Sequence, residues 1–270
     1  MVCFPNCKLN IGLYITSKRA DGYHNLETIF YPVKGLKDVL EVVPAETTAI
    51  ALHGKTVAGD MHDNLVWKAY QLLKQDFPNL PALSIHLLKN IPMGAGMGGG
   101  SADGAFMIKL LNDYNALGLT NEAMISYALQ LGSDCPFFIE NTPQYATGRG
   151  EVMQPVSIDL SAYSIQLICP QVHVSTAAAF KMITPKPAPF DLRKLPELPI
   201  EQWKDVVSND FEAPVFAQHP ELAAIKEQLY AQGAIYAAMS GSGSTVYGIF
   251  TKGQKAVKNI SEEFEQYTLI

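Results

Sequence analysis

The feature that most constrains the fold is a glycine-rich segment, residues 91–105, in which six of the eleven residues from Gly94 to Gly104 are glycine. Alternating apolar residues in 83–87 predict a strand before it, and apolar spacing after it predicts a helix that opens near Ser101. A tight strand-to-helix turn needs only one or two glycines. A loop this rich in glycine lets the backbone approach a phosphate, which the N–H groups of the following helix also favour. The segment therefore predicts a phosphate-binding loop.

The glycine spacing alone does not define which nucleotide fold the chain adopts. Gly94, Gly96 and Gly99 match the dinucleotide fingerprint, but residues 112–120 lack the second strand and acidic residue that it requires. A Walker A loop is also excluded, because Ala49 stands where the first glycine would precede Gly54-Lys55-Thr56. The His-Arg-Asp and Asp-Phe-Gly motifs of protein kinases are missing. The loop therefore belongs to a different class of phosphate-binding protein.

Composition narrows the class of protein further. A chain of 270 residues with 48% hydrophobic residues can bury a large core, and its net charge of −6 argues against a broad nucleic-acid-binding face. No segment predicts a signal peptide or a membrane span. The four cysteines show no zinc-site spacing and are expected to be reduced thiols. We therefore expect a cytoplasmic protein.

Elsewhere the chain mixes strands and helices without strict βαβ alternation, which favours an α+β fold with a boundary near residue 150. Residues 1–16 alternate as a half-buried strand does, and Asp63 is expected to cap a helix that starts at Asn64. Thr120 is expected to cap a helix that Gly132 ends. Further predictions are strands at 26–33, 39–43, 47–52, 163–169, 234–238 and 246–250, helices at 177–182, 221–232 and the C-terminus, and a proline-rich surface loop at 183–200.

Two other segments carry residues that suit an anion. Lys8 stands in an otherwise apolar strand, where a charge is costly to bury unless it meets an anion, although an edge-strand lysine that reaches water remains the alternative. Residues 239–245, Met-Ser-Gly-Ser-Gly-Ser-Thr, lie between two predicted strands and are either a second anion-binding nest or an ordinary hairpin turn.

Together and in this order, the three segments resemble the family of galactokinase, homoserine kinase, mevalonate kinase and phosphomevalonate kinase, the GHMP kinases. The resemblance covers nearly the whole chain. Within the family, residues 5–10 and Asp21-Gly-Tyr-His24 look like the branch that phosphorylates 4-diphosphocytidyl-2-C-methyl-D-erythritol. The resemblance implies a two-lobed α+β GHMP-kinase fold. Residues 1–150 would form an N-terminal lobe like ribosomal protein S5 domain 2, and residues 151–270 a C-terminal α/β-sandwich lobe.

The resemblance also implies an activity. The chain would transfer a phosphoryl group from ATP, with Mg²⁺, to the 2-hydroxyl of the cytidine-containing substrate, in the non-mevalonate pathway to isoprenoid precursors. Its partners would be small molecules and not nucleic acid or membrane, and it would be a monomer or a weak homodimer. Ala102 replaces a serine of the usual family loop, so the metal ligands are not assigned.

Site residues follow from the same resemblance. Asp134 would be the catalytic carboxylate, in a short connection between Gly132 and Pro136, although a residue placed there can also merely cap the next turn. Lys8 would keep that carboxylate ionised and counter transition-state charge. The predicted ATP-binding residues are Asn64, Pro92, Met93, Gly94, Ala95, Gly96, Met97, Gly98, Gly99, Gly100, Ser101 and Ala102. The predicted substrate-binding residues are Asn10, Tyr23, His24, Thr176, Phe180, Gly241 and Ser242, with Tyr23 and Phe180 stacking on the cytosine.

Two rival interpretations stay open from the sequence. One is a family kinase with another acceptor, such as homoserine or mevalonate, against which Asp21-Gly-Tyr-His24 argues. The other is a nucleotide-binding module that has lost catalysis, against which the presence of both Lys8 and Asp134 argues.

Overall fold

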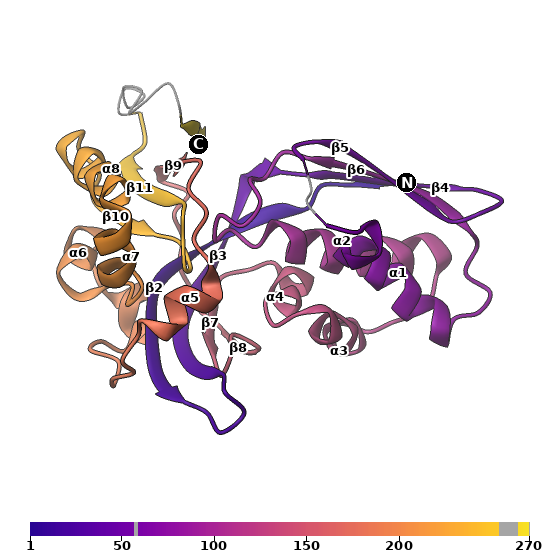
Figure 1. Cartoon of the computed structure of the whole chain (residues 1–270), viewed down its shortest axis with the longest axis horizontal. Helices are drawn as coiled ribbons and strands as arrows, with labels where there is room; N and C mark the ends of the chain where they lie inside the picture. The colour runs from indigo at the N-terminus through magenta and orange to yellow at the C-terminus, as the bar shows by residue number, and fades with distance from the viewer. Residues whose placement is uncertain (57–58, 254–263, 270) are drawn as a thin grey trace. The chain divides into compact units, whose positions relative to one another are not determined.

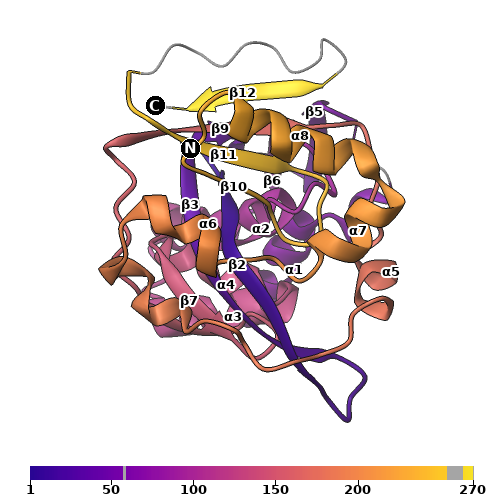
Figure 2. The same cartoon turned by 90° about the vertical axis from the view of Figure 1, so that its left-hand side faces the viewer.

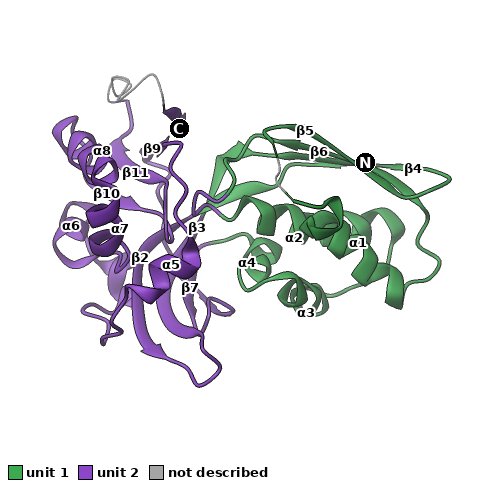
Figure 3. Ribbon diagram, viewed as in Figure 1, with its two compact units in different colours: residues 1–8, 32–93, 98–142 green, residues 9–31, 94–97, 143–270 purple. Residues whose placement is uncertain are grey.

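The computed structural model describes residues 1–56, 59–253 and 264–269 of the 270-residue chain (Figure 1). The described chain divides into two compact units, neither of which is one continuous segment (Figure 3). Unit 1 comprises Met1–Lys8, Pro32–Met93 and Gly98–Thr142, and unit 2 comprises Leu9–Tyr31, Gly94–Met97 and Pro143–Ile270. No helix in the described ranges is long and apolar enough to cross a membrane.

Unit 1 is a sheet with helices on one face, and this face holds its core. The strand order is β1-β4-β6-β5, antiparallel except for the parallel pair β5 and β6 (Figure 1). Alternation along β6 turns Leu83, Ile85 and Leu87 inward, and all three are fully buried. The elements are β1 (Val2–Cys3), β4 (Val39–Pro44), β5 (Ala49–Gly54), the 3₁₀ helix η1 (Met61–Asp63), α1 (Leu65–Asp76), β6 (Leu83–Lys89), α2 (Gly99–Asn115), α3 (Asn121–Leu131) and α4 (Cys135–Glu140).

Unit 2 contains a four-stranded antiparallel sheet in the order β10-β11-β9-β12 (Figure 2). Helix α8 packs on this sheet through Leu222, Ile225 and Leu229, which are buried at the spacing of a helical face. The elements are β7 (Gln144–Thr147), β8 (Val152–Pro155), β9 (Tyr163–Cys169), α5 (Thr176–Lys181), η2 (Leu192–Glu197), η3 (Ile200–Gln202), α6 (Trp203–Val206), α7 (Glu212–Gln218), α8 (Pro220–Ala231), β10 (Tyr236–Met239), β11 (Val246–Thr251) and β12 (Glu265–Leu269).

A third sheet, in the order β2-β3-β7-β8, contains the two longest strands of the described chain, β2 (Asn6–Lys18) and β3 (His24–Lys37), and both supply residues to each unit. The sequence predicts a half-buried first strand, which is wrong for β2. Ten consecutive residues, from Asn6 to Ile15, are buried. Protein atoms cover both faces of this strand, so Lys8 does not reach water although β2 is the end strand of its sheet; its side chain is only 5% exposed.

Several local predictions are confirmed and others need correction. Thr120 caps α3 and Gly132 ends it, as predicted. Asn64, and not Asp63, caps α1, because the Asn64 side chain accepts a hydrogen bond from Val66 N. The proline-rich stretch contains η2 and η3, whose Leu192 and Leu195 are fully buried, and is therefore not simply a surface loop.

The predicted C-terminal helix falls mainly on residues 254–263, which lie outside the described residues. The last described element is the strand β12.

Candidate functional site

The charged pair predicted for catalysis lies within unit 1. Lys8 Nζ is 3.5 Å from Asp134 Oδ2, and the Lys8 side chain is 5% exposed while that of Asp134 is 34% exposed. The ammonium of Lys8 is therefore buried, while the carboxylate of Asp134 is accessible to a bound molecule. The pair can therefore offer a carboxylate to a bound hydroxyl group while the lysine supplies positive charge.

Asp134 stands at the N-cap position of α4, which has Pro136 in its first turn and five buried residues. Its side chain makes no capping hydrogen bond. The structure therefore does not support the alternative that Asp134 merely caps the next turn. The neighbouring Cys135 is fully buried, and burial raises the pKa of its thiol to about 12. Cys135 is therefore a neutral thiol and not a competing nucleophile.

The end of the glycine loop adjoins this pair. Gly98 is the N-cap of α2 in the left-handed conformation, and no side chain caps the helix, which leaves its first N–H groups for an anion. A Cβ atom at Gly98 would lie 3.1 Å from Phe138 Cζ and 3.2 Å from Lys8 Cγ. Lys8 and the start of α2 are thus direct neighbours, as a phosphoryl-transfer site requires.

The middle of the loop, Gly94–Met97, is held against the second glycine-rich turn within unit 2. Ser240 Oγ donates to Gly96 O at 2.9 Å, and Thr245 N donates to Ala95 O at 3.2 Å. A Cβ atom at Gly96 would overlap the Ser240 carbonyl oxygen, so this close approach requires glycine. Residues 240–245 are the turn of the β10–β11 hairpin, and this turn supports the loop.

We expect Gly98→Val to weaken ATP binding by about tenfold or more, a loss of about 1.4 kcal/mol. A β-branched side chain is strained at φ +69° and would press on Lys8 and Phe138. Calorimetric titration with ATP measures the effect. Gly118→Val is the matched control, because Gly118 has φ +72° with open space around it and is not part of the loop. Equal ATP affinity in the two folded variants would show that the loop is not part of the nucleotide site.

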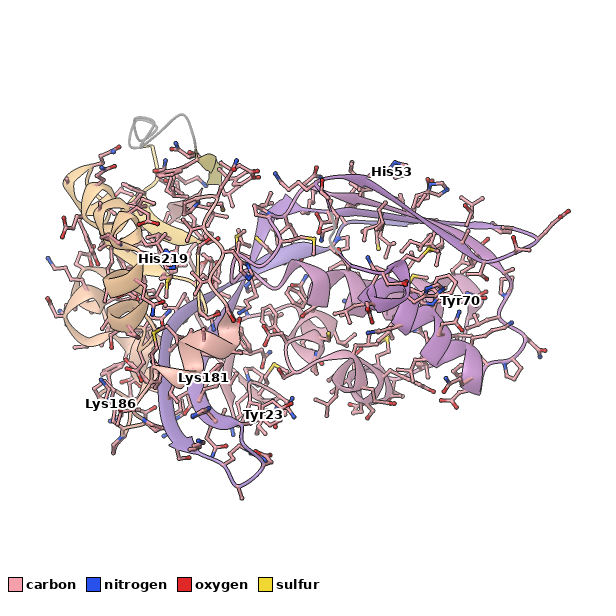
Figure 4. All side chains as sticks on the ribbon, in the orientation of Figure 1. Tyr23, His53, Tyr70, Lys181, Lys186 and His219 are labelled. Atoms are coloured by element: carbon pink, nitrogen blue, oxygen red, sulfur yellow. The ribbon has the colours of Figure 1, made fainter. Side chains whose placement is uncertain are left out.

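The aromatic residues predicted for the substrate lie in unit 2. The His24 and Phe180 rings stack at a centroid distance of 5.1 Å, and Phe180 also contacts Phe211. Tyr23, in the turn between β2 and β3, is half exposed and carries the Arg149 guanidinium 4.0 Å from its ring centroid (Figure 4). These contacts join residues from the β2–β3 turn, α5 and the segment after β7. The contacts form two groups, His24 with Phe180 and Phe211, and Tyr23 with Arg149, and each group offers an aromatic ring.

Polar residues predicted for the substrate also lie in unit 2. Asn10 donates from its side chain to Thr28 Oγ1 at 2.9 Å, and its backbone N–H donates to Ser240 Oγ. Thr176 and Ser242 share a hydrogen bond of 3.0 Å between their hydroxyls, and Gly241 stands between Ser240 and Ser242. The structure therefore brings the start of α5 to the second glycine-rich turn.

The predicted residues divide between the units. Lys8, Asn64, Asp134 and residues 98–102 belong to unit 1, while Asn10, Tyr23, His24, Thr176, Phe180 and the second glycine-rich turn belong to unit 2. Asn64 uses its side-chain oxygen to cap α1, so it has a structural role whether or not it also contacts a nucleotide.

A buried charged triad flanking the loop was missed from the sequence. Lys89, at the end of β6, contacts Asp38 and lies 2.5 Å from Asp103 Oδ2 in α2. Asp38 also accepts hydrogen bonds from the backbone N–H groups of Asn90 and Ile91, at 2.6 and 2.8 Å. The triad therefore joins the residues just before the loop to the first turns of the helix after it. The sequence signal that could have found Lys89 is a lysine in an apolar strand, which is also the signal that identifies Lys8.

Among the described residues, no three His, Cys, Asp or Glu side chains gather as a protein metal cage would. Mg²⁺ in phosphoryl-transfer sites is bound mainly by phosphate oxygens and water, with few protein ligands. The donor set near α2 fits that mode of binding. Ser101 offers a hydroxyl in the first turn of α2, and Asp134 offers a carboxylate.

Comparison with known proteins extends these observations over the whole chain. A model of the GHMP kinases N terminal domain matches residues 64–141, and a GHMP kinases C terminal model matches residues 195–267. A 4-diphosphocytidyl-2-C-methyl-D-erythritol kinase of Bacteroides thetaiotaomicron is 50% identical, over 93% of this chain and 92% of the relative. One of Parabacteroides distasonis is 49% identical, with the same coverage.

Solved structures agree with this assignment. A crystal structure of 4-(cytidine 5'-diphospho)-2C-methyl-D-erythritol kinase has a TM-score of 0.74 and 30% identity, over 92% of this chain and 90% of that one. Phosphomevalonate kinase of Streptococcus pneumoniae has a TM-score of 0.72 over all of both chains, but at 14% identity it shows only the shared fold. The chain therefore belongs to the GHMP kinases and, within them, to the 4-diphosphocytidyl-2-C-methyl-D-erythritol kinases.

Proposed function

We propose that this kinase transfers the γ-phosphoryl group of ATP to the 2-hydroxyl of 4-diphosphocytidyl-2-C-methyl-D-erythritol, giving the 2-phosphate and ADP. The reaction belongs to the non-mevalonate route to isoprenoid precursors. The observation that carries the proposal is the Lys8–Asp134 pair beside the uncapped N-terminus of α2. Phosphoryl transfer needs positioned charge more than covalent chemistry, and this arrangement supplies a carboxylate, an ammonium and a helix N-terminus.

In the proposed step, the 2-hydroxyl oxygen attacks the γ-phosphorus of ATP. A new O–P bond forms, the bond between the γ-phosphorus and the β,γ-bridging oxygen breaks, and ADP leaves with that oxygen. Asp134 takes the proton of the hydroxyl group, a role that its partly exposed carboxylate allows. Lys8, almost fully buried and 3.5 Å from that carboxylate, balances the negative charge that develops on the transferred group.

ATP occupies the glycine loop from Pro92 to Ala102, with its phosphates toward the backbone N–H groups at the start of α2. Mg²⁺, when bound, neutralises charge on the phosphates, and the Ser101 hydroxyl is the protein oxygen that we assign to it. Asn64 contacts the adenine or the ribose in this assignment.

The cytidine end of the substrate binds in unit 2. Tyr23 and Phe180 stack on the cytosine ring, and His24, which packs on Phe180, bonds to the pyrimidine edge. Asn10 reaches the diphosphate, and Thr176, Gly241 and Ser242 complete the substrate site.

We expect Tyr23→Ala and Phe180→Ala each to weaken substrate binding by roughly 1–3 kcal/mol and to leave ATP binding unchanged, because the stacking acts on the base. The double variant should lose less than the sum, since both rings share one partner. Calorimetric titration with the substrate measures all three. Phe216→Ala is the control for Phe180, because Phe216 packs on the same core. Wild-type substrate affinity in either single variant would make that residue a structural aromatic.

The activity itself is tested with a panel of acceptors. ADP formation with 4-diphosphocytidyl-2-C-methyl-D-erythritol should exceed that with homoserine or mevalonate by several orders of magnitude. Faster turnover of homoserine or mevalonate would favour the rival kinases, and no turnover with any acceptor would favour the non-catalytic module.

Three further points complete the proposal. The chain divides into two family domains, 1–150 and 151–270, a boundary supported by family matches that fall on either side of residue 150, although Leu9–Tyr31 of the first domain belongs to compact unit 2. In this proposal the protein is a monomer or a weak homodimer. It works in the cytoplasm, a reducing compartment that suits its four free cysteines.

A further inference from the structure

Two asparagine side chains in unit 1 are joined by two reciprocal hydrogen bonds. Asn6 Nδ2 donates to Asn141 Oδ1 at 3.2 Å, and Asn141 Nδ2 donates to Asn6 Oδ1 at 2.7 Å. Asn6 is 4% exposed and also donates to the Cys7 carbonyl oxygen at 2.9 Å. The two reciprocal bonds fix both the distance and the relative orientation of the two amides.

Each residue of this amide pair lies on the same element as one residue of the Lys8–Asp134 pair, either β2 or α4. Asn6 lies two residues before Lys8 on β2, so their side chains share a face of the strand. Asn141 is the C-cap of α4, and Asp134 is its N-cap. Helix α4 has only six residues, five of them buried, so we expect a displacement at one end to be transmitted to the other. The amide pair therefore links the same two elements as the ion pair, at the opposite end of α4.

The backbone at Asn141 gives an independent reason to look for a role of its side chain. Asn141 has φ +52°, a left-handed conformation in which glycine costs least. In the described part of the chain, only Ala116 shares this conformation among residues other than glycine. Glycine would end α4 with less strain, but it would leave the Asn6 amide without its partner.

We infer that Asn6 and Asn141 are positioning residues that set the separation of Lys8 and Asp134. This inference rests on the proposed function, because it matters only if the ion pair takes part in catalysis. A shift of about 1 Å in a reacting group can reduce a rate by about 10²-fold. The amide pair acts on that distance and contacts neither of the two charged groups in the bonds described above.

The first variant is Asn141→Gly, which keeps the left-handed backbone and deletes only the side chain. We expect kcat to fall by about 10- to 100-fold, with KM for ATP and for the cytidine substrate unchanged. Ala116→Gly is the matched control. Ala116 is the C-cap of α2 at φ +48°, so the same glycine substitution relieves the same strain and removes no side-chain hydrogen bond. It should keep wild-type kcat.

The second variant, Asn6→Ala, removes the other half of the amide pair and should lower kcat by the same factor as Asn141→Gly. The double variant should be no slower than either single one, because the two residues form one unit. Circular dichroism and thermal melting confirm that each protein is folded. Additive losses would mean that the two asparagines act separately, and would overturn the inference.

A double-mutant cycle with Lys8→Met separates positioning from general stability. If the amide pair acts through the ion pair, Asn141→Gly should change kcat by less than about twofold in the Lys8→Met background. An equal loss in both backgrounds, or wild-type kcat for Asn141→Gly alone, would overturn the inference but leave the proposed function intact. Wild-type kcat for Lys8→Met would overturn the proposed role of Lys8, and the inference with it.

Discussion

We expect Asp134→Asn to lower kcat by roughly 10²–10⁴-fold and to leave ATP affinity unchanged. The factor is that expected when a general base is removed. The amide has the shape of the carboxylate, but it cannot take the proton of the attacking hydroxyl group. Its loss of charge also leaves Lys8, 3.5 Å away and almost fully buried, without its anion. Steady-state kinetics with both substrates, together with ATP titration, measures the two effects.

Glu140→Gln is the control for this substitution. Glu140 is the last residue of α4, the helix that Asp134 begins, and it is exposed. The same change from carboxylate to amide there should leave kcat within about twofold, as surface substitutions away from special features usually do. A folded Asp134→Asn enzyme that turns over as fast as Glu140→Gln would show that Asp134 is not the base.

We expect Lys89→Met to destabilise the folded protein by about 3–5 kcal/mol, the cost of removing one partner from a buried ion pair. Burial alone would lower the pKa of Lys89, but Asp103 and Asp38 outweigh burial and raise it, so the ammonium is charged in the folded state. Methionine fills a similar volume but leaves Asp38 and Asp103 in the core without the ammonium, where burial already raises the pKa of Asp103 well above its usual value. Equilibrium unfolding in urea, followed by tryptophan fluorescence, gives the free energy of unfolding.

Lys68→Met is the control for the triad. Lys68 pairs with Asp63 at 3.0 Å, but both side chains are exposed, and such pairs contribute between about zero and 1 kcal/mol. If the two methionine variants unfold at the same urea concentration, the triad does not stabilise the fold. A larger loss for Lys89→Met should be accompanied by weaker ATP binding, since the triad holds both flanks of the loop.

Features encoded by local sequence could be predicted. The glycine loop, the helix after it and the caps of α3 depend on residues within a few positions of one another. The resemblance to the GHMP kinases implies a joint role for Lys8 and Asp134, and the structure places their charged groups 3.5 Å apart. At α1 the local signal is ambiguous, because Asp63 and Asn64 are both good N-cap residues. In the structure Asn64 is the N-cap.

Features that depend on distant parts of the chain could not be predicted. The period-two pattern of β2 indicates one buried face, but protein atoms cover the other face as well, and no local pattern records that. Lys89 was missed because its two carboxylates lie 51 and 14 residues away. The amide pair joins residues 135 positions apart, and asparagine at either position looks like an ordinary polar residue in the sequence.

The burial of β2 has a consequence for how the protein is made. Asn10 is synthesised long before its partners, because its backbone N–H and carbonyl groups are bonded by Ser240 and Tyr247, which follow 230 and 237 residues later. At about 5–20 residues per second, the ribosome needs on the order of 10–50 s to supply these partners. For that time an apolar strand with Asn10 at its centre lacks its final neighbours. Because such long-range contacts form slowly and leave hydrophobic surface exposed meanwhile, we expect truncation before residue 240 to leave this strand incomplete.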